Sequence, residues 1–198
     1  MLEVWRTGRY DQLANERILH ESISNTQEME ESVILLRPKN RGFRSVNIMK
    51  ILVTYKSKTG FTKKYAKWIA EGLNCETKDI KDVSSKDVAK YDLVIHGGWI
   101  FGGIISGYKK IKSFAPKQLI VFGVGFTPKA KVDLKKMAED NKLGDTPLYY
   151  FEGGTNPPKM GFVGRKVVEM VTKEKVSYQD NTDIKATAEL LKAVKALK

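Results

Sequence analysis

The chain has 198 residues, of which 41% are hydrophobic, and a formal net charge of +12. This length suits one domain with an appendage, and the apolar content is sufficient for a sizeable core. No apolar run approaches the roughly 20 residues of a membrane span, and the N-terminus lacks the apolar stretch of a signal peptide. The single cysteine, Cys75, excludes an internal disulfide and a cysteine-built metal site. We therefore expect a cytoplasmic globular protein.

The positive charge is concentrated after residue 48. Residues 1–48 hold seven basic and seven acidic residues, so the remainder carries the whole excess. A solvated lysine-rich surface is one explanation, and attraction to an acidic protein or to an anionic membrane surface is another. Attraction to an anionic membrane surface would make the protein membrane-associated. No nucleic-acid-binding motif is present, so we expect no nucleic-acid partner.

Residues 1–48 show only weak organisation. Residues 10–20 could form a helix and residues 32–36 a short strand, after which Pro38 and Gly42 interrupt the pattern. We interpret 1–48 as a non-essential N-terminal extension. The alternative is a docking or dimerisation arm.

From residue 49 onward, apolar strands alternate with amphipathic helices. The predicted strands are 50–55, 76–80, 93–95, 119–124 and 148–151, and predicted helices lie between and after them, near 63–73, 84–89, 106–114, 132–140, 162–171 and 190–197. Alternation of this kind predicts an α/β fold with a parallel sheet covered by helices on both faces. Ligands of such folds bind at the carboxyl ends of the strands, beside the switch point in strand order.

The segment Ser57-Lys58-Thr59-Gly60-Phe61-Thr62 lies between the first predicted strand and the first predicted helix. Such a turn directs backbone N–H groups, hydroxyls and the positive end of a helix dipole at one point, which suits a phosphate. Gly60 allows the backbone to approach closely, because it has no Cβ. An ordinary polar turn between a strand and a helix is the alternative.

The order Ser-x-Thr-Gly-x-Thr in this segment resembles the FMN-phosphate loop of the flavodoxins. The resemblance covers roughly residues 49–198. It implies a flavodoxin-like, doubly wound, five-stranded parallel sheet of order 2-1-3-4-5, and a bound FMN.

The third predicted strand is followed by four glycines and two large aromatic residues within 96–103. Aromatic rings can stack on a planar ligand, and glycines admit backbone close to its edge. By resemblance to flavodoxins, Phe101 would stack on the flavin and the Gly102 carbonyl would turn toward flavin N5. Gly98, Trp99 and Ile100 complete this predicted loop, with the roles of Trp99 and Phe101 open to exchange. Aromatics that merely cover the end of the sheet are the alternative.

The fourth predicted strand leads into Gly123-Val124-Gly125-Phe126-Thr127-Pro128. This is a near match to the dinucleotide fingerprint G-x-G-x-x-G, but Pro128 replaces the third glycine, so we discount it. In flavodoxins the corresponding loop covers the other side of the flavin. Gly125, Phe126 and Thr127 are the matching candidates.

An additional basic, amphipathic helix is predicted at 162–171, after the fifth strand. This layout resembles the flavodoxin-domain group that includes menaquinone-dependent protoporphyrinogen dehydrogenase, whose members reduce a quinone at the membrane. Pro158 and Arg165-Lys166 fit that group, whereas Trp99 and the central glycines differ from it. An ordinary packed helix is the alternative to a membrane contact.

No catalytic constellation accompanies the predicted flavin site, because flavin itself supplies the redox chemistry. Three functions remain open. The protein is an FMN electron carrier that serves a redox partner protein, a flavin-dependent dehydrogenase that uses a quinone, or a flavin-free interaction module on the same fold.

Overall fold

A parallel β-sheet forms the centre of the protein. The computed structural model describes residues 49–197, except for the side chains of residues 171 and 172, so the extension expected over 1–48 lies outside the described residues. The sheet has the order β2-β1-β3-β5-β6, and all neighbouring pairs on this path are parallel. This confirms the predicted order of five strands. The strands are β1 (Ile51–Lys56), β2 (Glu76–Asp79), β3 (Leu93–Phe101), β5 (Leu119–Gly125) and β6 (Leu148–Glu152).

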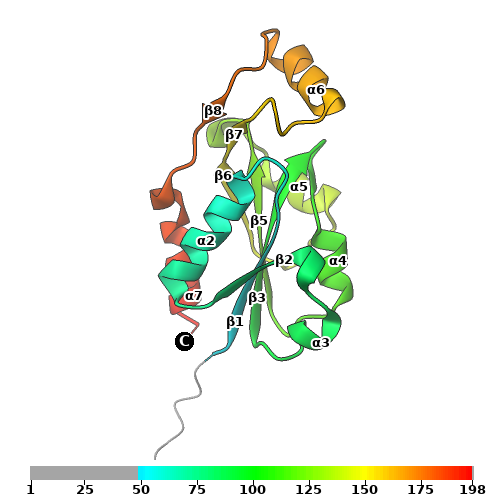
Figure 1. Ribbon diagram of the computed structural model, residues 1–198. Helices are drawn as coiled ribbons and strands as arrows, with labels where there is room; N and C mark the ends of the chain where they lie inside the picture. The colour runs from blue at the N-terminus through cyan, green and yellow to red at the C-terminus, as the bar shows by residue number, and fades with distance from the viewer. Residues whose placement is uncertain (1–48, 198) are drawn as a thin grey trace, which may run out of the picture. The chain divides into compact units, whose positions relative to one another are not determined.

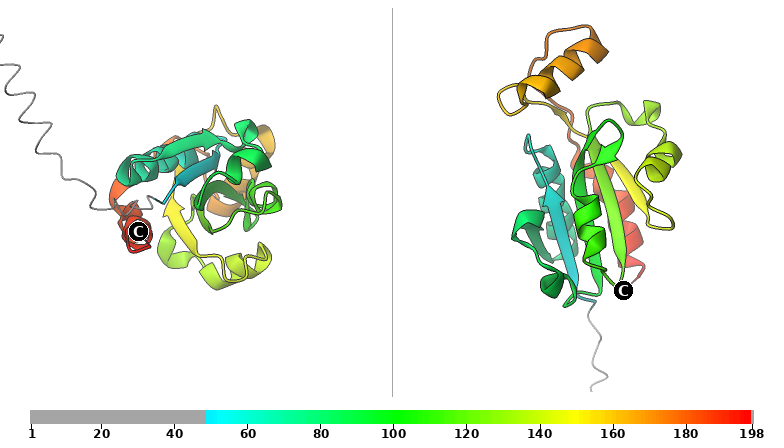
Figure 2. Two further views of the ribbon diagram at one scale, coloured as in Figure 1. Left: turned by 90° about the horizontal axis from the view of Figure 1, so that it is seen from below. Right: turned by 90° about the vertical axis from the view of Figure 1, so that its right-hand side faces the viewer.

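Helices cover both faces of this sheet. One layer is α2 (Phe61–Leu73) with α7 (Ala188–Lys195), and the other is α3 (Ser85–Val88), α4 (Tyr108–Ser113) and α5 (Leu134–Asp140). Figure 1 shows the layers on opposite sides of the sheet, and the turned views of Figure 2 agree.

Successive strand residues face opposite layers, so each layer has its own core. Val53 and Phe122 pack in the cluster beneath α2 and α7, whereas Leu52 and Val121 pack in the cluster beneath α3, α4 and α5. Burial on both faces explains why these strands are continuous apolar runs in the sequence.

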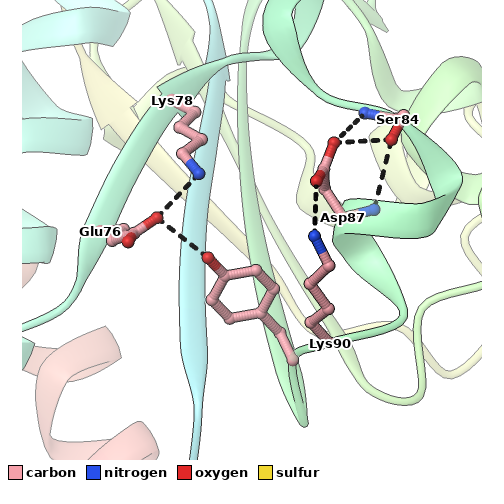
Figure 3. Close-up of polar contacts among 6 residues, drawn as sticks. Glu76, Lys78, Ser84, Asp87 and Lys90 are labelled. Carbon is pink, nitrogen blue, oxygen red and sulfur yellow. Dashed lines mark hydrogen bonds and ion pairs between the residues drawn. The ribbon is translucent and has the colours of Figure 1, made fainter.

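Charged residues lie along the edge of the sheet at β2. The Glu76 carboxylate forms an ion pair with the Lys78 ammonium at 2.8 Å and accepts a hydrogen bond from the Tyr91 hydroxyl at 2.9 Å. Close by, the Ser84 hydroxyl accepts from the Asp87 N–H, and the Asp87 carboxylate accepts from the Ser84 N–H and hydroxyl (Figure 3). The hydrogen bonds from Ser84 lower the pKa of Asp87 to about 2. This reciprocal cap begins α3.

The third strand is longer than the sequence predicted. We expected a strand that ends at Ile95, followed by a glycine-rich loop over 96–103. Instead, β3 continues to Phe101, and the chain turns at Gly102–Gly103 and returns as β4 (Ile104–Ile105). The predicted loop is therefore a strand extension and a β-hairpin.

Two glycines inside β3 make this extension possible. A Cβ at Gly97 would lie 2.0 Å from the Phe122 ring, and a Cβ at Gly98 would lie 2.3 Å from the carbonyl oxygen of Ser106. Ser106 in turn donates its N–H to the carbonyl of Trp99 at 3.0 Å. These glycines are required for close packing of a strand rather than for a loop conformation.

Residues 156–178 form an excursion between β6 and α7, which we call the arm. Its base is closed by an antiparallel pair, β7 (Gly154–Thr155) and β8 (Gln179–Asp180). The arm carries α6 (Phe162–Thr172), which lies beyond the carboxyl ends of the parallel strands (Figure 1). Neither α6 nor any other helix of residues 49–197 has the length and apolar character needed to cross a bilayer.

Candidate functional site

The turn between β1 and α2 has the geometry of an anion-binding site. Gly60 has a φ of +106°, which L-residues with a side chain rarely adopt, and its N–H donates to the Ser57 hydroxyl at 3.2 Å. The first intrahelical bond runs from the Lys64 N–H to the Gly60 carbonyl. No side chain caps the start of α2, so the N–H groups of residues 61–63 remain available at the positive end of the helix dipole.

A cavity of about 580 Å³ lies at the carboxyl ends of β1, β3 and β5 and reaches this turn. Eleven of the predicted site residues line it: Lys58, Thr59, Phe61, Thr62, Trp99, Ile100, Phe101, Gly102, Gly125, Phe126 and Thr127. Three others do not. Ser57 and Gly60 act within the turn itself, and Gly98 is a strand residue covered by Ser106.

The hairpin supplies the aromatic part of the cavity. The rings of Trp99 and Phe101 lie 6.1 Å apart between centroids at an interplanar angle of 62°, and Phe101 is 47% exposed. The Lys58 ammonium lies 5.7 Å from the centroid of the Trp99 ring. The Lys58 ammonium, from the turn between β1 and α2, and the aromatic rings of the hairpin therefore face the same part of the cavity.

The loop after β5 is held by a residue that sequence reasoning missed. The Tyr150 hydroxyl donates to the carbonyl of Thr127, and a Cβ at Gly125 would lie 2.7 Å from the same hydroxyl. Burial raises the pKa of Tyr150 to about 12, so the hydroxyl stays protonated and keeps donating. No local motif marks Tyr150, because its role depends on the parallel pairing of β6 with β5.

Two further elements line the cavity, and neither was included in the predicted site. They are the segment around α5, with Lys131, Val132, Asp133, Lys136, Met137 and Asp140, and the arm, with Met160, Val163, Gly164, Val167 and Val168. The amphipathic pattern of α6 was visible in the sequence, but its position over the cavity was not. Among the described residues, no group of three or more His, Cys, Asp or Glu side chains could hold a metal ion.

His96 supports the hairpin from within the sheet. The fully buried imidazole is hydrogen-bonded through Nδ1 to the Thr54 hydroxyl at 2.9 Å and through Nε2 to the Ser106 carbonyl at 3.0 Å. Burial lowers the pKa of His96 to about 4, so the ring is neutral at pH 7. A neutral ring that donates from Nε2 to the carbonyl must accept from Thr54 at Nδ1. The histidine therefore fixes the strand that returns from the hairpin.

The strand order and a cavity at the carboxyl ends of β1, β3 and β5 define a flavodoxin-like protein. The chain belongs to the flavodoxin domain family, whose sequence model matches residues 52–182.

Individual proteins match a smaller part of this chain than the family model does. The flavodoxin-like domain-containing protein BilS of Clostridioides difficile (strain CD3) is 39% identical over 82 residues, which cover 38% of this chain and 46% of that protein. The match thus spans less than half of this curated relative. Oxidised flavodoxin 2 of Bacillus cereus is 21% identical over 52% of this chain and 84% of its own, with a TM-score of 0.38. Two-electron reduced flavodoxin of Megasphaera elsdenii is 21% identical over 50% and 82%, with a TM-score of 0.38.

Proposed function

We propose that the protein binds FMN and transfers electrons through it. The observation that carries this proposal is that one cavity joins the uncapped start of α2 to the aromatic hairpin. Its volume lies within the range of roughly 300–1,000 Å³ that is usual for cofactor sites. A Cβ added at Gly60 or at Gly102 would have no atom within 4 Å, so both turns leave open space beside the backbone. The residues present therefore fit a phosphate at one end and a flat ring at the other.

Each part of the cavity would contribute one function to FMN binding. Thr59 and Thr62 would donate hydroxyl hydrogen bonds to the phosphate, together with the N–H groups of residues 61–63, and Lys58 would balance its charge. Trp99, Phe101 and Phe126 would cover the ring and exclude water. When bound, FMN supplies the electron-transfer chemistry.

Flavin reconstitution tests the proposal. We expect the purified protein to bind FMN with a visible flavin absorbance, and to bind riboflavin, which lacks the phosphate, much more weakly. A protein that binds neither flavin would be better explained as an interaction module on the same fold. Equal affinity for FMN and riboflavin would remove the α2 turn from the site.

A second candidate function is that of a flavin-dependent dehydrogenase with a quinone acceptor, as in the group that includes menaquinone-dependent protoporphyrinogen dehydrogenase. The observation in its favour is the apolar wall that Met160, Val163 and Val167 add to the cavity. An apolar acceptor could approach a bound ring along this wall. Rapid reoxidation of the reduced, FMN-loaded protein by a soluble naphthoquinone would support this candidate. Slow reoxidation by the quinone and fast reoxidation by a redox protein would favour the electron carrier.

We further propose that the arm docks on an anionic membrane surface. Phe162, Val163 and Met170 are 69%, 66% and 74% exposed, although all are large apolar side chains. Lys166 lies over the Phe162 ring, 5.9 Å from its centroid. Between residues 156 and 178 the arm has five basic and two acidic residues. Exposed apolar side chains next to lysine and arginine suit the boundary between lipid headgroups and acyl chains.

We expect salt-sensitive binding to vesicles that contain phosphatidylserine, and weak binding to vesicles of phosphatidylcholine alone. Each basic residue near such a surface contributes about 1 kcal/mol, so Arg165→Glu should weaken binding by roughly 30-fold. Met170→Asp should also weaken it, because docking needs the apolar side chains as well as the charge. Val167 is a poorer choice for this test, since it lines the cavity.

Lys86→Glu is the matched control, because it reverses an exposed charge on α3, at the opposite end of the sheet from the arm (Figure 1). Equal weakening by Lys86→Glu and Arg165→Glu would show that net charge alone drives binding. Vesicle sedimentation at low ionic strength measures all four proteins. A wild-type protein that stays in the supernatant would point instead to a soluble acidic redox partner.

A further inference from the structure

The tip of the hairpin is tied to α5 by one buried side chain, that of Asn141. Its Oδ1 accepts from the Ile105 N–H at 2.8 Å, and its Nδ2 donates to the Gly103 carbonyl at 2.8 Å. The same Nδ2 donates to the Met137 carbonyl within α5, also at 2.8 Å. Asn141 is only 9% exposed and does not line the cavity. The side chain thus uses its acceptor and both donors to hold the hairpin from outside the site.

These bonds fix one side of the hairpin turn and leave its centre free. Gly102 and Gly103 have φ values of +56° and +81°, as in the two-residue turns of tight hairpins. Asn141 holds the peptide groups that follow Gly103, and the hydrogen bonds of Ser106 to His96 and Trp99 hold the next part of the return strand. The peptide between Gly102 and Gly103 has neither restraint.

That central peptide can rotate between two common hairpin turns. Positive φ at both central residues characterises type I′, and rotation of the central peptide gives type II′, in which only the first residue keeps a positive φ. Gly102 therefore keeps its unusual φ in both turns. A Cβ at Gly102 would meet no atom within 4 Å, and Gly102 lines the cavity, so the turn has open space beside it.

We infer that Asn141 is a positioning residue that confines movement of the hairpin to the Gly102–Gly103 peptide and thereby sets the one-electron potentials of the bound flavin. The inference rests on the proposed FMN site. The hydrogen bonds of Asn141 form a fixed frame for the turn. A carbonyl on this frame would have few orientations to lose on hydrogen-bonding to a bound flavin, so the bond would form at a lower entropic cost. Without the frame, the whole tip of the hairpin must be ordered at the same time.

Two substitutions separate the parts of this frame. Asn141→Ala removes the acceptor for Ile105 and both donors. Asn141→Asp keeps an acceptor for Ile105 and loses the donors to the Gly103 and Met137 carbonyls. Tyr108→Phe is the matched control, because it removes a buried hydroxyl that donates to the carbonyl of Lys142, the residue after Asn141, at 3.4 Å rather than to a group of the hairpin.

The first readout needs no flavin. In the apoprotein, we expect the Ile105 amide to exchange hydrogen about tenfold faster or more in Asn141→Ala, and at a nearly unchanged rate in Asn141→Asp and Tyr108→Phe. The second readout is redox titration with FMN. In Asn141→Ala, which adds no charge, the first one-electron potential should fall relative to the second by about 59 mV or more, which corresponds to tenfold. The charge added in Asn141→Asp would act differently on the two electron-transfer steps, so that variant serves the hydrogen-exchange readout.

Affinity for oxidised FMN should change by less than about threefold in both Asn141 variants, because this side chain does not line the cavity. If wild-type protein binds FMN and Asn141→Ala titrates like Tyr108→Phe, the inference fails and the FMN proposal stands. If wild-type protein binds no FMN, both fail. Should Asn141→Ala not fold, the near-isosteric and uncharged Asn141→Leu takes its place in the same comparison.

Discussion

Alanine at both Thr59 and Thr62 should weaken FMN binding by about 3 kcal/mol, on the order of 100-fold, because each buried polar partner left unsatisfied costs about 1–3 kcal/mol. Both threonines line the cavity at the start of α2, and Thr62 is 2% exposed. Water cannot easily replace a hydroxyl at such a buried position, so the phosphate would lose its hydrogen bonds. The effect should be larger for FMN than for riboflavin, since riboflavin has no phosphate to lose contact with.

Titration calorimetry of the apoprotein with both ligands measures this difference. Thr146→Ala is the matched control, because Thr146 lines a separate depression in the surface, formed in part by Pro116, Lys117 and Pro147. A double variant that keeps wild-type affinity for FMN would place the phosphate elsewhere.

The free energy of unfolding should fall by about 3 kcal/mol as the pH drops from about 6.5 to about 4, because of the titration of His96 alone. The folded protein holds the pKa of His96 at about 4, whereas the unfolded chain has the ordinary value of 6.5. Between these values the unfolded chain binds the proton and the folded protein does not, so protonation favours unfolding. The contribution of the neutral imidazole is complete above pH 6.5 and is lost as the pH falls toward 4.

Urea unfolding at pH 7.0 and pH 4.5 tests this expectation when wild-type protein is compared with His96→Gln. A glutamine at this position has no titrating group, so the free energy of unfolding of the variant should depend less on pH. Carboxylates that titrate in the same range contribute equally to both proteins and cancel in the comparison. Parallel pH profiles for the two proteins would show that the imidazole is protonated without penalty.

The sequence was sufficient to predict the sheet, but not the full length of β3. Strands buried on both faces are continuous apolar runs, as in Leu93–Ile95, and such runs are recognisable as parallel strands from residue types alone. Gly97 and Gly98 are poor strand formers, so propensity ends the strand too early. Their presence in β3 depends on the Phe122 ring and on the backbone of Ser106, which are contacts of the folded chain.

The hairpin itself carried a usable signal. Gly102-Gly103 is a dipeptide typical of tight hairpins, and it is flanked by Ile100-Phe101 and Ile104-Ile105. Recognition of that pattern would have replaced the predicted loop with two paired strands. Asn141 carried no such signal, because a polar residue at the end of a helix is common and its partners lie far away in the sequence.

The predicted site was most complete where one short segment supplies a whole function. The turn at 57–62 contains its own glycine, hydroxyls and helix start, so its residue types, together with their resemblance to the flavodoxin phosphate loop, were enough to predict it. Tyr150 and the residues of the arm reach the cavity only through the pairing of β5 with β6 and through the fold of the arm. Contacts of that kind are fixed by tertiary structure and leave no local pattern.

The closed base of the arm makes it a separable module. The Asn181 N–H donates to the Gly153 carbonyl at 2.8 Å, and Thr155 pairs with Gln179, so the chain returns after the arm to the point at which it left. A tight turn from Thr155 to Gln179 could replace residues 156–178 without altering the path from β6 to α7. Insertions, deletions and exchanges in the arm are thus open to evolution and to protein engineering, and they would change only the wall that the arm adds to the cavity. In the proposed scheme, the choice of docking surface can diverge between relatives while the cofactor stays the same.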